Sequence, residues 1–146
     1  MQIEIKIDPT CEEPKIIVMT DKVTDEVNLV IRKLSEEAPQ VLAGFREDVV
    51  EVLEQSEIIR FYAASGKIFA VTTQGEYSLR RRLYELEEML DKRDFVRISN
   101  SEIINLRKAK GFDLSFAGTI CVTMSNGDAV YVSRRYVSKI KQVLGL

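Results

Sequence analysis

From residue 41 onward the chain is a series of short apolar runs that turn-forming pairs separate. The runs lie at residues 49–53, 58–63, 67–73, 76–80, 95–98, 103–106, 110–116, 119–124 and 129–132. Closely spaced runs rich in β-branched and aromatic residues predict strands joined as hairpins and meanders. The pairs that separate the runs include Ser65-Gly66, Gln74-Gly75, Ala117-Gly118 and Asn126-Gly127. Asn126-Gly127 is the clearest signal, because both central positions of a type I′ turn need a positive φ. This pattern predicts a mainly β protein of the α+β class.

Two helices are predicted within the same part of the chain. The first runs from Arg81 to about Leu90 and has leucine and methionine on one face. The second runs from Arg134 to about Leu144, and Ser133 stands where an N-cap hydroxyl is favoured. The chain is therefore expected to end in an amphipathic helix that packs on the strands.

The first 40 residues follow a different pattern. Residues 2–8 (QIEIKID) alternate isoleucine with polar residues and predict a half-buried strand, and residues 15–19 (KIIVM) predict a second strand that could pair with it. A helix starting at Thr20 or Asp21 and running to about Glu37 would follow, with Pro39 as its stop. We predict a β-β-α segment over residues 1–40, too small to bury a core alone, and a domain over residues 41–146. The N-terminal segment is the expected site of dimerisation or partner binding.

The composition excludes several classes of protein. Histidine is absent from all 146 residues, which removes Ser-His-Asp and Cys-His hydrolases and histidine-ligated metal sites. Cys11 and Cys121 form no CxxC pair, and free thiols fit a cytoplasmic location. Neither a phosphate-binding glycine loop nor a calcium-loop spacing is present. We expect no enzyme activity, no catalytic residue, no cofactor and no metal site.

The sequence contains no sign of a membrane segment. No run approaches the ~18–20 apolar residues that a spanning helix needs, and the start, MQIEIKID, lacks the apolar core of a signal peptide. The expectation is a cytoplasmic protein that does not span a membrane.

Charge is distributed unevenly along the chain. Residues 1–59 carry six basic and fourteen acidic residues, a net of −8, whereas residues 60–146 carry fifteen basic and nine acidic residues, a net of +6. Because the charge of the contacting face governs attraction to phosphate, the overall pI near 5.4 does not exclude nucleic acid. Attraction between the two halves of the chain is the alternative explanation.

Polar and basic side chains coincide in three places, namely residues 65–67, residues 97–107 and residues 133–136. Asparagine can form two hydrogen bonds with the edge of adenine, and arginine can do the same with guanine. Serine, lysine and helix N-termini are usual phosphate contacts. These three places are therefore candidates for contact with DNA.

Two of these places carry a family resemblance. Residues 95–106 (FVRISNSEIINL) resemble the central signature of the LytTR-type DNA-binding domain, and residues 130–136 (VYVSRRY) resemble its end motif. The resemblance covers about residues 41–146 and implies small antiparallel sheets with a C-terminal helix. Ser99 stands where this family commonly has histidine, and Glu102 where it commonly has an aromatic residue.

The resemblance also implies a function and a set of contacts. Domains of this type read major-groove bases through loops, commonly on tandem repeats near promoters. The base contacts of the family fall near Lys67, on Asn100 and on Arg135. We predict base readout by Asn100 and Arg135, with phosphate contacts from Arg97, Lys67 and the helix start at Ser133. The predicted DNA-binding residues are Lys67, Arg97, Ser99, Asn100, Ser101, Ser133, Arg134 and Arg135. The expected partners are double-stranded DNA, a second copy of the chain and a small inhibitory membrane protein.

Structural explanations for the same residues stay open at this point. Asn100 could satisfy its own backbone in an Asx-turn, and Asn105 could bond the backbone within the meander. The run of arginines at residues 80–82 could be a solvated helix start, and Tyr136 could be a packing residue. The alternative function is a protein–protein interaction module or anti-activator that keeps the fold without binding DNA, and Ser99 and Glu102 are the features that favour it.

Overall fold

The computed structural model describes residues 1–34 and 41–146, which belong to two units, Met1–Ala38 and Pro39–Leu146. The predicted helix end near Glu37 and the stop at Pro39 lie outside the described residues. We consider each unit by itself.

The N-terminal unit differs from the predicted β-β-α segment. Its one described helix is α1 (Asp25–Leu34), and residues 1–24, all of them described, contain turns and bends but no strand. The strand predictions for residues 2–8 and 15–19 were therefore wrong. Alternation gives a strand two distinct faces, but a hairpin with nothing packed on it is marginal in water. The helix also begins later than predicted, at Asp25, where the hydroxyl of Thr24 accepts a hydrogen bond from the Val27 amide (3.3 Å).

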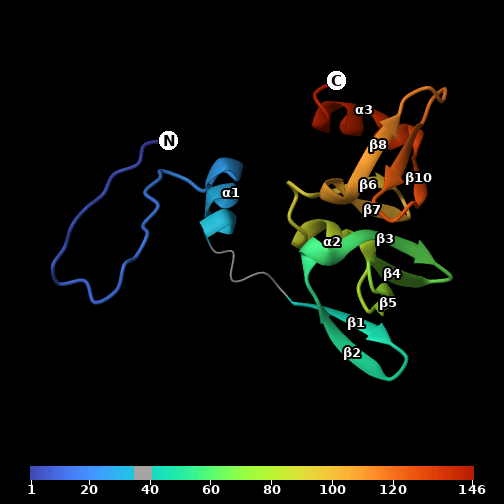
Figure 1. The fold of residues 1–146 in the computed structure, drawn as a ribbon. Helices are drawn as coiled ribbons and strands as arrows, with labels where there is room; N and C mark the ends of the chain where they lie inside the picture. Colours follow the sequence, from blue (N-terminus) through green and yellow to red (C-terminus); the bar gives the residue numbers. More distant parts are fainter. Residues whose placement is uncertain (35–40) are drawn as a thin grey trace. The chain divides into compact units, whose positions relative to one another are not determined.

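The C-terminal unit is built on a seven-stranded antiparallel sheet in the order β2-β1-β5-β4-β3-β7-β6 (Figure 1). Its strands are β1 (Leu42–Arg46), β2 (Val49–Leu53), β3 (Ile58–Ala64), β4 (Lys67–Thr72), β5 (Gly75–Leu79), β6 (Phe95–Ser99) and β7 (Glu102–Asn105). Helix α2 (Leu83–Met89) follows β5, and short 3-10 helices occupy Gln55–Glu57 and Leu106–Lys108. The predicted strands of this region are confirmed. Strand β1 was not predicted, because its Gly44 resembles a linker residue.

A three-stranded antiparallel sheet and the last helix complete the unit. The sheet has the order β10-β9-β8, and its strands are β8 (Ala109–Asp113), β9 (Ile120–Met124) and β10 (Ala129–Val132). Helix α3 (Arg134–Val143) follows directly after β10, as predicted. The mainly β, α+β class is confirmed.

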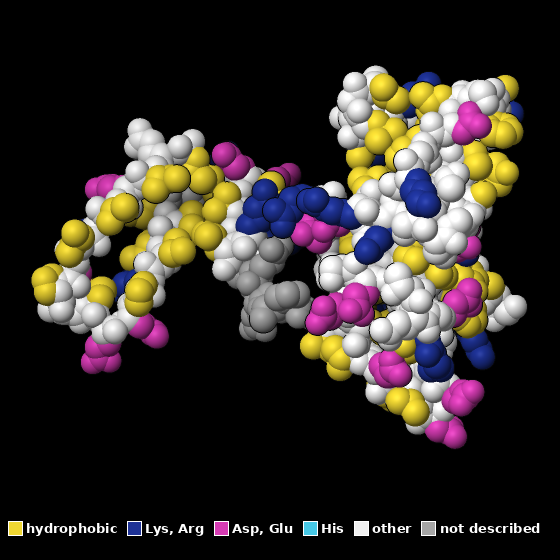
Figure 2. Space-filling model, viewed as in Figure 1, with side chains coloured by type: hydrophobic (Ala, Val, Ile, Leu, Met, Phe, Trp, Pro, Cys, Tyr) yellow, Lys and Arg dark blue, Asp and Glu magenta, His cyan; other side chains and the backbone are white. Residues whose placement is uncertain are grey.

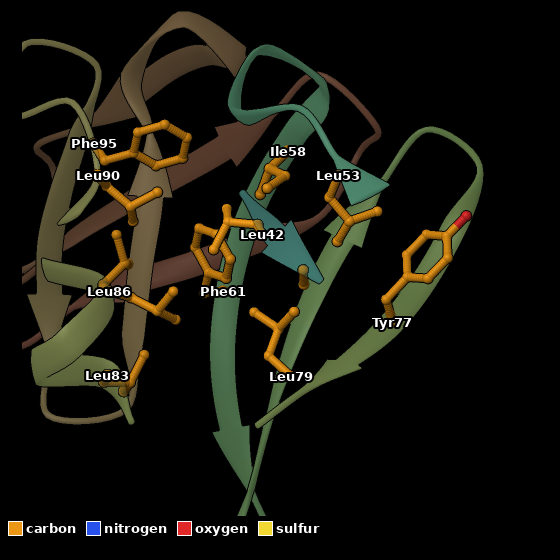
Figure 3. Packing of buried hydrophobic residues seen from close by; sticks show 12 residues of the cluster. Leu42, Leu53, Ile58, Phe61, Tyr77, Leu79, Leu83, Leu86, Leu90 and Phe95 are labelled. Carbon is orange, nitrogen blue, oxygen red and sulfur yellow. The ribbon is translucent and has the colours of Figure 1, made fainter. Parts of the chain in front are cut away.

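The two faces of the large sheet bury different sets of residues. One face packs Phe61, Phe95 and Ile103 against Leu83 and Leu86 of α2 (Figure 3). The opposite face packs Ile59, Val96, Ile98 and Ile104 against the three-stranded sheet and Ile140 of α3. Neighbouring residues such as Ile103 and Ile104 therefore enter different cores, as the two-residue period of a strand requires.

Two of the predicted turns have different outcomes. Ser65 and Gly66, the two residues between β3 and β4, have φ values of 53° and 74°, which fits the two-residue turn that a tight hairpin favours. At the β9–β10 connection, Gly127 has a φ of 93° but Asn126 is outside the positive region, so the predicted type I′ geometry was wrong there. Asn126 instead donates from its side chain to Asp128 (2.9 Å) and accepts from the Asp128 amide (3.0 Å).

Candidate nucleic-acid interface

The turn between β6 and β7 holds three of the predicted DNA-binding residues. The hydroxyl of Ser99 accepts a hydrogen bond from the Ser101 amide (3.1 Å) and lies 3.3 Å from the Ser101 hydroxyl. Ser99 rather than Asn100 therefore satisfies the turn backbone, and the Asx-turn explanation for Asn100 is not seen. The side chain of Asn100 is exposed and has no hydrogen-bond partner among the described residues.

Arg97 fixes the shape of this turn from within. Its guanidinium donates to the carbonyl oxygens of Ser99 (2.9 Å) and Asn100 (2.8 Å). A third bond, to Glu87 of α2 (2.9 Å), ties the same group to the neighbouring helix. The Arg97 side chain is 15% exposed. These contacts favour a positioning role over the predicted phosphate contact, because each of the three guanidinium nitrogens of Arg97 already has an acceptor in the protein.

The same turn touches the tip of the β3–β4 hairpin. The Ala63 amide of β3 donates to the Ser101 carbonyl (2.8 Å). Ala63 lies close to the Ser65-Gly66 tip, and Lys67 pairs with Ala64 across that tip. Lys67 is exposed, and its side chain has no ion-pair partner among the residues that are described. The hairpin thus brings exposed Lys67 to the same end of the sheet as the Asn100 turn, with β3 between them.

The start of α3 is tied to the strand that precedes the turn. The Ser133 amide donates to the Ile98 carbonyl (2.9 Å), so the helix begins next to the end of β6. Ser133 occupies the N-cap position, but its hydroxyl forms no capping hydrogen bond. Arg134 and Arg135 follow, and both are exposed. Tyr136 packs against the second core, as its packing explanation predicted.

Three places that are far apart in the sequence therefore meet at one end of the large sheet. The Ser101–Ala63 and Ser133–Ile98 bonds place the β3–β4 hairpin, the β6–β7 turn and the α3 start in succession along that end. The end of β5 lies there too, because Leu79 pairs with Ile68 next to Lys67. The arginines at residues 80–82 thus border the same surface, although Arg80 stacks on Phe45 (4.4 Å) and Arg81 lies 4.0 Å from Glu85.

This arrangement has close relatives among known proteins. The family model of the LytTr DNA-binding domain matches residues 48–145. The chain belongs to the LytTr DNA-binding domain family. Its structure is similar to the solved LytTr DNA-binding domain of a Bacillus cereus protein, with a TM-score of 0.70, 25% identity, and 73% of this chain and 97% of that chain covered. The resemblance of the central and end motifs is thereby confirmed.

Curated relatives cover almost the whole chain. An uncharacterized HTH-type transcriptional regulator of Staphylococcus aureus strain NCTC 8325 is 29% identical over 147 residues, which is 100% of this chain and 99% of the relative. Another, from strain MRSA252, is 28% identical over the same span. In the part of the LytTr chain that the structure describes, strands separate each helix from the next, and no two helices form a helix-turn-helix.

Arg60 of β3 connects the two sheets. Its guanidinium donates to Asp128 at the β9–β10 connection (3.1 Å) and lies 3.5 Å from Oε2 of Glu102. Burial raises the pKa of Glu102, Arg60 acts to lower it and Asp128 acts to raise it. The hydrogen bond from Asn126, with that from Arg60, holds the pKa of Asp128 below its ordinary value. Oε2 of Glu102 is buried and accepts no hydrogen bond. Of the two carboxylates that face Arg60, Glu102 is therefore the one that lacks a hydrogen bond to this oxygen.

Asn105, the second asparagine of the central signature, is a structural residue. It is 2% exposed, its amide group donates to the Ile58 carbonyl (2.8 Å), and its oxygen accepts from the Arg107 amide (3.0 Å). The prediction that Asn105 bonds backbone within the meander is confirmed. Sequence reasoning missed Arg60, whose partner Asp128 is 68 residues away in the chain, and Glu87, which it had placed on a solvated helix face.

The described residues contain no group of three or more His, Cys, Asp or Glu side chains placed to hold a metal ion. Among the same residues, no helix is long and apolar enough to cross a membrane.

Proposed function

We propose that this protein is a transcriptional regulator that binds specific DNA sequences through the end of the large sheet. The observation that carries the proposal is the pair of backbone hydrogen bonds, Ser101–Ala63 and Ser133–Ile98, that gathers the three predicted contact places. Exposed Lys67, Asn100 and Arg135 then stand on three different elements of one surface. Separate loops on one surface suit contact with successive major grooves of a duplex.

The proposal gives the residues different tasks. Asn100 and Arg135 read bases, because both side chains are exposed and can form the paired hydrogen bonds that distinguish base edges. Lys67, Arg134 and the Ser133 helix start contact phosphates. Ser99, Ser101 and Arg97 hold the turn that presents Asn100. The regulator binds tandem repeats as a homodimer in the cytoplasm. Its restraint by a small membrane protein stays a prediction.

Selection of bound duplexes from a random DNA pool tests the proposal. The wild-type chain should enrich a spaced repeat, and the variant Asn100→Ala/Arg135→Ala should not. Lys141→Ala is the matched control, because it removes an exposed positive charge from the last turn of the same helix. Failure of the folded wild-type protein to enrich any sequence would contradict the proposal.

Measurements on the selected duplex separate base contacts from phosphate contacts. Arg135→Ala should cost about 1–3 kcal/mol and relax specificity at one base pair, whereas Lys67→Ala should weaken all sequences alike and reduce the salt slope by about 1. An equal loss on every sequence from Arg135→Ala would mean that Arg135 contacts only phosphate.

The alternative function, an interaction module or anti-activator without DNA binding, is favoured by Ser99 and Glu102, which differ from the residues common in the family. Salt dependence discriminates between the two functions. Affinity for DNA that falls steeply with salt reports counterion release from phosphate contacts, which a mixed protein interface does not produce.

A further inference from the structure

The N-terminal unit leaves an unusual amount of apolar surface uncovered. Ile3, Ile5 and Ile7 are 94%, 88% and 88% exposed, and Met19 is 91% exposed. Figure 2 shows hydrophobic side chains along this extended segment. Contiguous exposed apolar residues of this kind mark a binding surface in a stable protein. In the part of this unit that the structure describes, no strand pairs with residues 2–8.

The backbone of this segment is prepared for a hairpin although the strands have not formed. The Cys11 amide donates to the Asp8 carbonyl (3.1 Å), and the Asp8 carboxylate accepts from the amide (2.9 Å) and the hydroxyl (2.6 Å) of Thr10. These two hydrogen bonds from Thr10 lower the pKa of Asp8. The chain therefore already reverses direction directly after residues 2–8. What residues 2–8 lack, among the described residues, is a second strand to pair with.

Residues 2–8 are self-complementary in one antiparallel register. When two copies pair about Ile5, residue 3 faces residue 7 and residue 4 faces residue 6 of the other copy. All three isoleucines then lie on one face of the ribbon, because alternate residues share a face. On the other face, Glu4 lies opposite Lys6 twice, once on each side of the two-fold axis. Opposite charges directly across a strand pair stabilise it.

Neighbouring registers lack this match. A shift by one residue places isoleucine opposite a charged residue, because it brings the two faces out of phase. A shift by two residues places Glu4 opposite Glu4 or Lys6 opposite Lys6, and a parallel pairing in register brings the same like charges together. Like charges directly opposite each other destabilise a strand pair. Charge and hydrophobic alternation thus select a single two-fold pairing.

From this we propose that residues 2–8 form the dimer interface by pairing with the same residues of a second copy, antiparallel and centred on Ile5. The pairing is isologous, as two-fold dimers require. The exposed apolar residues that follow, Ile17 and Met19 and then Leu34 of α1, are available to cover the isoleucine face of the ribbon. This inference deepens the homodimer of the proposed function and does not depend on DNA binding.

Charge reversal in the full-length protein tests the register. Glu4→Lys places a new lysine opposite Lys6, and Lys6→Glu places a new glutamate opposite Glu4, so each variant alone should dimerise about tenfold more weakly than wild type. An equimolar mixture of the two variants should recover wild-type dimerisation, because each strand then faces its charge complement. The double variant Glu4→Lys/Lys6→Glu should recover it as well. Analytical ultracentrifugation over a range of protein concentrations measures the dimer dissociation constant of each protein.

The matched control is Glu12→Lys, which makes the same charge change just outside the paired residues and should leave dimerisation unchanged. Ile5→Asp should leave the protein monomeric at every concentration that gives wild-type dimers. Monomeric wild-type protein, or single variants that dimerise like wild type, would overturn the proposal.

Failure of this inference is distinguishable from failure of the proposed function. A wild-type chain that dimerises in the expected register but enriches no DNA contradicts the proposed function alone. A chain that enriches a spaced repeat as a dimer, while its single charge variants dimerise like wild type, contradicts the dimer interface alone.

Discussion

Two segments of this chain have nearly the same local pattern and different structures. Residues 2–8 alternate isoleucine with polar residues and form no strand, whereas residues 95–99 become β6 of the large sheet. Ile5 is 88% exposed, and Ile98 is fully buried. The difference lies in the surroundings, because β6 has β7 beside it and the three-stranded sheet packed on one face. Alternation makes a segment capable of being a strand, and a neighbour with a core decides whether it becomes one.

The largest expected effect on the free energy of unfolding comes from shortening a buried side chain in the large sheet. Ile104→Ala should lower the free energy of unfolding by about 2–5 kcal/mol, because Ile104 is fully buried in the core between the two sheets. Ile5→Ala, measured at concentrations where the protein is monomeric, should change it by less than about 0.5 kcal/mol. Urea denaturation checks both values. Similar losses in the two variants would break the comparison.

A second contrast uses the two asparagines of the central signature. Asn105→Ala should cost about 1–3 kcal/mol of stability, since it leaves the Ile58 carbonyl and the Arg107 amide without their partner. Asn100→Ala should cost less than about 0.5 kcal/mol and should act on DNA binding instead. Thermal unfolding and DNA titration, made on the same two variants, separate these roles. Equal stability losses would place Asn100 in the fold rather than in the interface.

The third effect concerns the hydrogen bonds by which Arg97 fixes the β6–β7 turn. Arg97→Ala should cost about 1–2 kcal/mol of stability, because two carbonyl oxygens and Glu87 lose a charged donor. Arg97→Lys should retain only part of this stability, because an ammonium group cannot reproduce the planar set of donors. In both variants DNA affinity for the selected sequence should fall, and specificity should relax at the base pair that Asn100 reads, because Arg97 holds the turn that presents Asn100. Unchanged affinity in the destabilised Arg97→Ala protein would mean that the turn keeps its shape without this side chain.

The smallest effect is the pH dependence that Glu102 confers. Burial raises the pKa of Glu102 above its ordinary value of 4.5, so the folded chain holds this proton more tightly than the unfolded chain. The stability that comes from this proton is complete below pH 4.5 and is lost as the pH rises through the raised pKa of the folded state. Glu102→Gln lacks this decline, and its stability relative to wild type should grow from pH 4.5 upward. Urea denaturation of both proteins at several pH values measures this change. A stability difference between Glu102→Gln and wild type that stays constant with pH would contradict the prediction.

The strands that short turns join could be predicted from the sequence, because turn residues such as glycine give a local signal. Ser65-Gly66 predicted its hairpin correctly. Asn126-Gly127 marked a real connection, but side-chain bonds to Asp128 gave it a different geometry. The strand at Leu42–Arg46 was missed because it depends on pairing with β2 and β5, which local pattern does not encode.

The residue types of the candidate site could be predicted from the sequence, but the hydrogen bonds that bring its segments together could not. The exposed positions of Lys67, Asn100 and Arg135 follow from turn and helix-start signals that a single segment carries. The bonds that gather them, such as Ser101 with Ala63, join residues far apart in the chain and leave no mark in either segment. Arg97 was predicted to contact phosphate, whereas its guanidinium bonds Ser99, Asn100 and Glu87, all within ten residues, and the residue types alone did not indicate these bonds.

The pairing of β3 with β7 has a consequence for how the molecule acquires its activity. The hairpins β1–β2, β3–β4 and β6–β7 each join consecutive strands, so each can form early and locally. The β3–β7 pairing closes a much longer loop and brings Ser101 to Ala63 only when it forms. A nascent chain that already holds all its hairpins therefore has not yet brought the β6–β7 turn to the β3–β4 hairpin. In the proposed function, DNA binding through this surface therefore requires the β3–β7 pairing, and copies that hold only their hairpins do not compete for DNA.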